Sequence, residues 1–195
     1  MVAQQSKRSA ILQVACKLVR ERGASQLTLD AVAKEAGVSK GGLLYHFPTK
    51  EALVQAALDD FLNRFDSSTE EEASRNTKLN NQWAQAYLIQ TFEINKEDLE
   101  MSFGILAAAS SNPVLLEPMR QRYVEWQSRM AAECKDPVEA TVARLAADGL
   151  FYCELFGFAP LEDGLRKDVL SYLLDMVKNR DVRSEGSPSN GAVQV

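Results

Sequence analysis

The chain has 195 residues, of which 46% are hydrophobic and 25% are charged, the balance of a globular protein that buries a core. No apolar run approaches the roughly 20 residues that cross a bilayer, so we expect no membrane partner. The N-terminal apolar stretch is interrupted by Gln13 and Lys17, and no small-residue cleavage site follows it. This favours an amphipathic helix over a signal peptide and predicts a cytoplasmic protein.

The charge is unevenly distributed along the chain. Although the net charge is −5, residues 1–50 hold eight Lys/Arg against three Asp/Glu and carry +5, and the rest carries −10. A basic N-terminal part joined to an acidic body is typical of a nucleic-acid reader fused to a domain with another task.

Cysteine and histidine usage predicts no metal and no cofactor. Cys16, Cys134 and Cys153 are widely spaced without a CxxC pair, and His46 is the single histidine. Cys16 and Cys153 lie among apolar neighbours and are interpreted as small core residues, with redox sensing by a cysteine left open.

Helical periodicity runs through the chain in the absence of useful strand alternation. The first helix ends at Gly23, the second follows the N-cap Thr28, and the third follows the N-cap Ser39 and ends before Pro48. Further helices are expected over about 50–65, 81–92, 96–110, 113–134, 137–156 and 161–178, with a loop over 66–80. We therefore predict an all-α chain of about nine helices, comprising a three-helix helix-turn-helix domain (1–50), a larger helical-bundle domain (51–182) and a disordered tail (183–195).

The segment from Thr28 to Phe47 predicts a helix-turn-helix. Gly37 can take a positive φ in the turn, and Ser39 both ends the turn and caps the next helix. The third helix then presents its outer face, and a helix of that width fits the major groove of DNA. The alternative interpretation is an ordinary helical hairpin with a solvated face.

Residues 6–53 resemble the DNA-binding domain of the TetR family of bacterial regulators, most specifically in the string GVSKGGLLYHFPTKEAL that begins at Gly37. The resemblance implies base or phosphate contacts near the N-terminus of the third helix and backbone contacts from Tyr45 and His46. It also implies phosphate contacts from Thr28 and Lys50. The expected DNA-binding residues are Thr28, Ser39, Lys40, Gly41, Gly42, Leu44, Tyr45, His46 and Lys50.

Two positions depart from the family pattern. Gly42 stands where the family often has Thr, and Leu44 stands where it often has an aromatic residue. Lys40 is therefore the best candidate for direct base readout, and DNA shape and dimer spacing are expected to supply much of the specificity.

The body is predicted to dimerise and to bind a ligand. The last two long helices carry apolar stripes that could be intramolecular core, but the family resemblance implies a homodimer through them and hence a palindromic operator. Aromatic residues on the central helices could be ordinary core or could line a pocket for a small hydrophobic or aromatic inducer, possibly one with a cationic group. The candidate ligand-binding residues are Trp83, Tyr87, Phe103, Tyr123, Trp126, Asp148 and Tyr152.

The sequence favours a homodimeric repressor whose inducer releases it from DNA. The alternative is a ligand-independent DNA-binding regulator whose body only dimerises; an enclosed aromatic cavity would favour the first and a filled core the second. An enzyme is not expected, because the chain has no paired acid and base, nucleophile motif, metal set or cofactor loop.

Overall fold

The computed structural model describes residues 2–23, 26–75, 81–110 and 112–178, and these residues form α-helices with no strand. The elements are α1 (Val2–Arg22), α2 (Leu29–Glu35), α3 (Lys40–His46), α4 (Lys50–Arg75), α5 (Gln82–Phe92), α6 (Lys96–Ser110), the 3₁₀ turn η2 (Pro113–Leu116), α7 (Glu117–Glu133), α8 (Pro137–Phe156) and α9 (Asp163–Val177). The all-α prediction is thus confirmed, and the predicted disordered tail over 183–195 lies outside the described residues.

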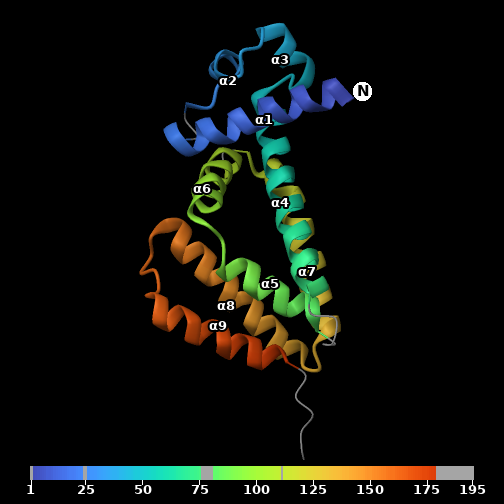
Figure 1. Cartoon of the computed structure of the whole chain (residues 1–195), viewed down its shortest axis with the longest axis vertical. Coiled ribbons are helices and arrows are strands. Elements are labelled where there is room, and N and C mark those ends of the chain that lie inside the picture. Colours follow the sequence, from blue (N-terminus) through green and yellow to red (C-terminus); the bar gives the residue numbers. More distant parts are fainter. Residues whose placement is uncertain (1, 24–25, 76–80, 111, 179–195) are drawn as a thin grey trace, which may run out of the picture.

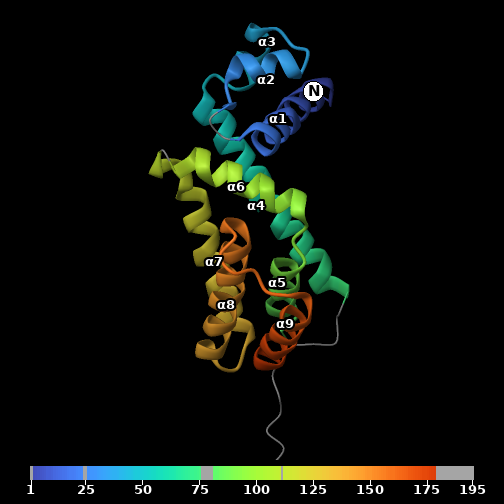
Figure 2. The same ribbon diagram turned by 90° about the vertical axis from the view of Figure 1, so that its left-hand side faces the viewer.

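The helices form a small head and a larger body (Figure 1). We call α1–α3 the head and α5–α9 the body, with α4 running from one to the other. Figure 2 shows α6 lying across the molecule just below the head, with α5, α7, α8 and α9 beyond it. Both α4 and α6 therefore connect the two parts, α6 by packing against α1.

The predicted end of the fourth helix near residue 65 is wrong, because α4 continues to Arg75. The helical period persists on its inner face, where Thr69 and Ala73 are buried. Its polar face is held by α7: Asp66 accepts a hydrogen bond from Trp126 Nε1 at 2.8 Å, and Glu70 pairs with Arg129. The polar residues that suggested a loop are the solvated and ion-paired side of a helix.

The predicted single helix over 113–134 is also divided. The chain forms the 3₁₀ turn first, and α7 begins at Glu117 with Pro118 in its first turn. Proline has no N–H to donate and its ring crowds the carbonyl four residues earlier, so a continuous α-helix from Pro113 would be broken there. Asn112 caps the short turn by accepting from the Val114 N–H at 3.2 Å.

Two glycines end helices, and the sequence predicted the first of them, Gly23. Gly23 follows α1 with φ +82°, and Gly157 follows α8 with φ +69°. After Gly157 the Phe158 N–H donates to the Cys153 carbonyl at 2.7 Å, which satisfies an otherwise unpaired acceptor at the helix end. The last helix is slightly shorter than predicted, spanning Asp163–Val177.

Candidate functional site

The turn between α2 and α3 is built by local hydrogen bonds. Thr28 Oγ1 accepts from the Ala31 N–H at 3.2 Å, and Ser39 Oγ accepts from the Gly42 N–H at 3.1 Å, so both residues are N-caps as predicted. Gly37 has φ +64°, a conformation that costs glycine no steric strain. Side chains of α2 and α3 that are buried between the helices, including Val32 and Leu43, hold the angle between them.

The outer face of α3 is open and mostly small. Lys40, Gly41 and Gly42 are exposed, and Tyr45 is 72% exposed with its ring edge-to-face against His46 at 5.2 Å between centroids. Leu44 and His46 are half-buried and so present less surface than predicted. The first three residues of α3 are therefore small or flexible as well as exposed. Another molecule can approach the helix backbone closely at this end.

Sequence analysis overlooked Lys7 as part of this surface. A groove of about 610 Å³ runs between α1 and α3, and Lys7 and Ile11 of α1 line it together with Ser39, Gly42, Tyr45 and His46. The groove is thus continuous with the exposed face of α3. The excess positive charge of residues 1–50 was the signal for Lys7, but only the fold shows that α1 contributes to the α3 side.

The two lysines expected to meet DNA have different surroundings. The Lys40 ammonium is paired with Asp30 of α2 at 2.9 Å, with both side chains well exposed. Lys50 is the first residue of α4, half-buried, next to Thr49, whose Oγ1 accepts from the Ala52 N–H at 3.0 Å. An exposed ion pair contributes little to stability, so the Lys40 ammonium is readily available to another anion.

In the body, the structure brings together all of the predicted ligand-binding residues except Phe103. Tyr87 lies at the centre, with its ring centroid 5.5 Å from Trp83 and 5.6 Å from Trp126, and Trp126 is 5.0 Å from Tyr123. Tyr152 reaches the group through its hydroxyl, 3.4 Å from that of Tyr123. We use the name aromatic cluster for Phe65, Trp83, Tyr87, Tyr123, Trp126 and Tyr152.

Phe103 lies elsewhere. It is 47% exposed on α6 and packs edge-to-face against Phe156 at the end of α8, 5.9 Å between centroids. Conversely, Phe65 belongs to the aromatic cluster, 5.4 Å from Tyr87 and 5.0 Å from Trp126, although it was not among the predicted ligand-binding residues. Phe65 thus joins α4 to the aromatic residues of α5 and α7.

Asp148 contacts the aromatic cluster, and both of its carboxylate oxygens have a polar partner within the chain. The Tyr87 hydroxyl donates to Asp148 Oδ1 at 2.6 Å, and Arg144, one turn earlier on α8, pairs with Oδ2. Arg144 also donates to Gln127, and its guanidinium lies over the Tyr123 ring at 5.8 Å. Burial raises the pKa of Asp148, and the hydrogen bond from Tyr87 and the charge of Arg144 partly oppose that rise.

The space inside the aromatic cluster is small. A cavity of about 30 Å³ is lined by residues of α4, α5, α7 and α8, including Phe65, Tyr87, Tyr123, Trp126 and Asp148. This is about the volume of a single water, whereas sites for drug-sized ligands measure roughly 300–1,000 Å³. In this conformation the aromatic side chains fill most of the space between α4, α5, α7 and α8.

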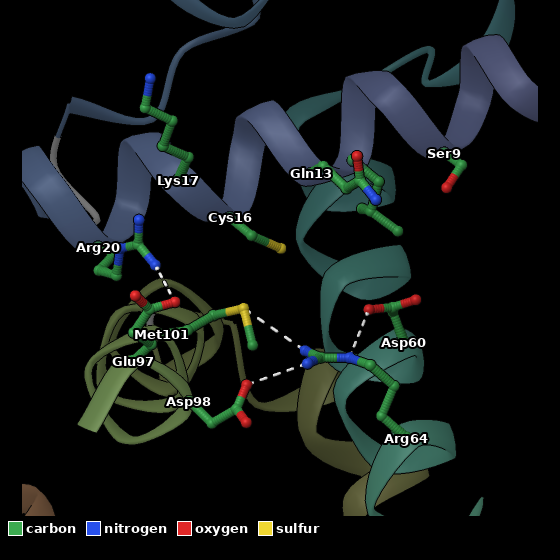
Figure 3. Close-up of a pocket in the computed structure, with 11 residues that line it drawn as sticks. Ser9, Gln13, Cys16, Lys17, Arg20, Asp60, Arg64, Glu97, Asp98 and Met101 are labelled. Atoms are coloured by element: carbon green, nitrogen blue, oxygen red, sulfur yellow. Dashed lines mark hydrogen bonds and ion pairs between the residues drawn. The ribbon is translucent and has the colours of Figure 1, made fainter. Parts of the chain in front are cut away.

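A larger pocket of about 380 Å³ lies between head and body (Figure 3). Cys16 of α1 and Met101 of α6 face it, and Arg64 of α4 bridges Asp60 and Asp98 with both ion pairs at 3.0 Å. Burial and the nearby Asp60 raise the pKa of the Cys16 thiol to about 11. Burial likewise raises the pKa of Cys134 to about 11, so neither thiol forms the reactive thiolate readily at neutral pH.

Beside this pocket, α1 and α6 approach very closely at Gly104. A Cβ built on Gly104 would lie 1.8 Å from Val19 Cγ1, far inside any real contact distance. Nearby, Arg20 of α1 pairs with Glu97 of α6 at 3.0 Å. The missing side chain of Gly104 therefore allows α1 and α6 to pack this closely. Sequence analysis gave Gly104 no role, because a lone glycine inside a helix does not reveal what it faces.

Membrane spans and metal sites are both absent from the described residues. No helix among them is long and apolar enough to cross a membrane. Across residues 2–23, 26–75, 81–110 and 112–178, no group of three or more His, Cys, Asp or Glu side chains has an arrangement that could hold a metal ion.

Curated relatives match about a third of the chain. The chain is 38% identical over 58 residues to the HTH-type transcriptional repressor KstR2 of Mycolicibacterium smegmatis, which covers 30% of this chain and 28% of that protein. It is 34% identical over 76 residues to the HTH-type transcriptional regulator EthR of Mycobacterium tuberculosis, covering 38% and 35%. The match thus spans about a third or less of these relatives.

Solved structures share the fold over nearly the whole chain. A member of the TetR family from Streptomyces coelicolor superposes with a TM-score of 0.67 at 24% identity, covering 86% of this chain and 97% of that one. The multidrug binding protein EbrR, solved with imidazole, gives 0.68 at 21% identity, covering 91% and 98%. Other EbrR structures hold malachite green or ethidium.

Family models match both parts of the molecule. The model described as bacterial regulatory proteins of the tetR family matches residues 11–57, which cover most of the head and the start of α4. The model described as the tetracyclin repressor-like C-terminal domain matches residues 81–178, from the beginning of α5 to the end of α9. The helix-turn-helix head and the helical body therefore agree on one conclusion: this chain belongs to the TetR family of bacterial regulators, and not to a family of enzymes.

Proposed function

We propose that this protein is a DNA-binding transcriptional repressor that acts as a homodimer and reads a palindromic operator with α3. The observation that carries the proposal is the open N-terminal end of α3, where Lys40, Gly41 and Gly42 are exposed on a positively charged head. A bare helix end of this kind can enter the major groove and approach phosphates and base edges. A protein with this task works in the cytoplasm.

The exposed apolar faces of α8 and α9 support dimerisation. Val138, Val142 and Leu145 form an exposed stripe along α8, and Leu165 and Tyr172, 55% and 68% exposed, lie on α9. By contrast, Leu150 of α8 and Leu173 of α9 are buried within the chain. Each of these helices therefore has one apolar face in the core and a second that a partner copy would cover, as in a two-fold interface.

We propose the aromatic cluster as the site of a small hydrophobic or aromatic inducer. The similarity of fold to EbrR, which is solved with aromatic ligands, supports this assignment. The small cavity means that a ligand has to displace side chains, and such a ligand stabilises a different arrangement of the helices from the one described here. The filled core is the arrangement that the second candidate predicts, a ligand-independent regulator whose body only dimerises.

Selection of bound fragments from the source genome tests the DNA-binding function. We expect enrichment of fragments that share an inverted repeat, and the genes beside them indicate the chemistry of an inducer to add to the binding assay. Release of the selected fragment by such a molecule supports induction, and persistent binding in its presence supports the ligand-independent regulator. Failure to enrich any sequence would contradict the proposed function.

The two lysines of the head should affect DNA binding differently. Lys40→Ala should weaken operator binding and reduce the preference for the operator over unrelated DNA, because its ammonium is the best base-reading group on α3. Lys50→Ala should weaken all sequences alike and reduce the slope of log affinity against log salt by about 1, the loss of one phosphate contact. A salt titration on operator and unrelated fragments measures both effects, and wild-type behaviour of both variants would contradict the assignment.

A charge placed on the proposed dimer surface should separate the protomers. Leu145 is 55% exposed in the single chain, and Leu145→Glu would bury a carboxylate in an apolar interface, at a cost that the interface cannot recover. We expect sedimentation to show monomers at concentrations where the wild type is dimeric. Val114→Glu, at an exposed valine of η2, is the matched control and should stay dimeric. Equal behaviour of the two variants would place the interface elsewhere.

A further inference from the structure

We propose that the aromatic cluster selects uncharged aromatic molecules, because Arg144 already occupies the carboxylate of Asp148 that a cationic ligand would need. This inference rests on the proposed function and concerns the same site. It specifies the chemical class of ligand, which the sequence left open between neutral and cationic aromatic molecules.

Asp148 is the charged residue that lines the cavity in the aromatic cluster. The other lining residues are aromatic, aliphatic or weakly polar, and Asp148 itself is only 7% exposed. An unpaired carboxylate in such surroundings would be a strong site for an organic cation, since a buried charge requires a partner. What Asp148 already binds therefore decides which ligands the cavity accepts.

Both oxygens of the Asp148 carboxylate have partners within the chain. Oδ1 accepts from the Tyr87 hydroxyl at 2.6 Å, and Oδ2 is paired with the Arg144 guanidinium. The side chains of Arg144 and Asp148 are 12% and 9% exposed, so the pair is shielded from solvent. Removing one member of a buried ion pair leaves the other charge buried without a partner, which is strongly destabilising. A cationic ligand that displaced Arg144 from Asp148 would leave the guanidinium in that position.

Arg144 is held in place by more than Asp148. It donates to the side chain of Gln127, which in turn donates to Thr141 Oγ1 at 2.7 Å. Its guanidinium also lies over the ring of Tyr123, a cation–π arrangement that an entering cation would have to replace. A cationic aromatic molecule would thus lose its hydration in the cavity and meet an electrically neutral pair.

An uncharged aromatic molecule meets neither obstacle. It can pack against the rings of Phe65, Tyr87 and Trp126 with little loss of hydration. Tyr123 and Tyr152 have their hydroxyl oxygens 3.4 Å apart. When Tyr152 donates to Tyr123, the hydroxyl hydrogen of Tyr123, which lines the cavity, is left for an acceptor on a ligand. The preferred ligand is therefore neutral, aromatic and equipped with a hydrogen-bond acceptor.

Ethidium and its uncharged parent, the same phenanthridine ring without the N-ethyl group, test this selectivity. Calorimetric titrations are run above the pKa of the parent's ring nitrogen, so that the two probes differ in charge. We expect the wild type to bind the neutral probe at least roughly tenfold more tightly. Wild-type protein that binds ethidium equally well or better would overturn the proposal.

Variants of the ion pair show whether charge is the cause. Arg144→Met frees Asp148 and should shift the preference towards ethidium by roughly tenfold or more, and Arg144→Met/Asp148→Asn should remove that gain. If Arg144→Met folds and still prefers the neutral probe as the wild type does, the proposal is contradicted. If this variant does not fold, the relative affinity of the wild type for the two probes decides. If neither probe binds any form, the ligand-class assignment fails, whereas enrichment of operator fragments by the same protein preparation would leave the DNA-binding function standing.

Discussion

Gly104→Ala is expected to raise the operator dissociation constant by roughly tenfold or more, equivalent to about 1.4 kcal/mol, although Gly104 is remote from α3. The new methyl group would lie 1.8 Å from Val19 Cγ1. Valine in a helix has one strongly preferred χ1 rotamer, so Val19 cannot turn away without strain. Hence α1 has to move relative to α6, and α1 carries the head with it. Operator titration by fluorescence anisotropy measures the effect.

A second substitution distinguishes displacement of the head from general damage. Val19→Ala removes Cγ1 and leaves Val19 Cβ 3.3 Å and the carbonyl oxygen 3.4 Å from the added methyl group, contacts that a small shift relieves. The Gly104→Ala/Val19→Ala double variant should therefore recover operator affinity relative to Gly104→Ala alone. Gly164→Ala, whose added methyl meets nothing within 4 Å, should bind as wild type. No recovery in the double variant would contradict a role for this contact in placing the head.

The second large effect concerns stability. Arg144→Met is expected to lower the free energy of unfolding by about 3–5 kcal/mol at neutral pH, because it leaves the Asp148 carboxylate buried without its partner. Urea denaturation measures this loss. Arg144→Met/Asp148→Asn, which removes both charges, should be more stable than Arg144→Met, since the replacement of a whole buried pair is often tolerated. A double variant that is no more stable than the single one would show that the pair is not the origin of the effect.

The loss in Arg144→Met should also depend on pH. Burial raises the pKa of Asp148 in the folded protein, and removal of Arg144, which opposes that rise, should raise it further. As the pH falls through the folded-state pKa, the folded variant takes up a proton that the unfolded chain does not yet bind. Protonation therefore favours the folded state, and the stability difference from wild type should shrink as the pH is lowered from neutral towards the ordinary pKa of an aspartate. A difference that grows on acidification would contradict this account.

The head could be predicted closely because its geometry depends on local chemistry. Thr28, Gly37 and Ser39 act on neighbouring backbone groups, and side-chain identity alone indicates each of those interactions. Lys7 escaped prediction because its place beside α3 depends on how α1 packs across the head. Local signals therefore predict the helix-turn-helix, but not which helix completes its surface.

The body could be predicted less well because its site depends on contacts between distant helices. Asp66 and Glu70 looked like loop residues until their partners on α7 were known. Phe103 has the same residue type as the members of the aromatic cluster but faces outward on α6. Arg144 was within reach of sequence analysis, since it lies four residues before Asp148 on one helix, a spacing that commonly forms ion pairs.

The arrangement of protomers on DNA tests the central claim, that two of these heads read one operator. The measurement is sedimentation of the wild-type protein with a selected operator fragment, combined with a footprint of the same complex. We expect two protomers per fragment and two protected half-sites roughly 34–36 Å apart, one turn of DNA, related by an inverted repeat. A single protomer per site, or protection without two-fold symmetry, would contradict the claim.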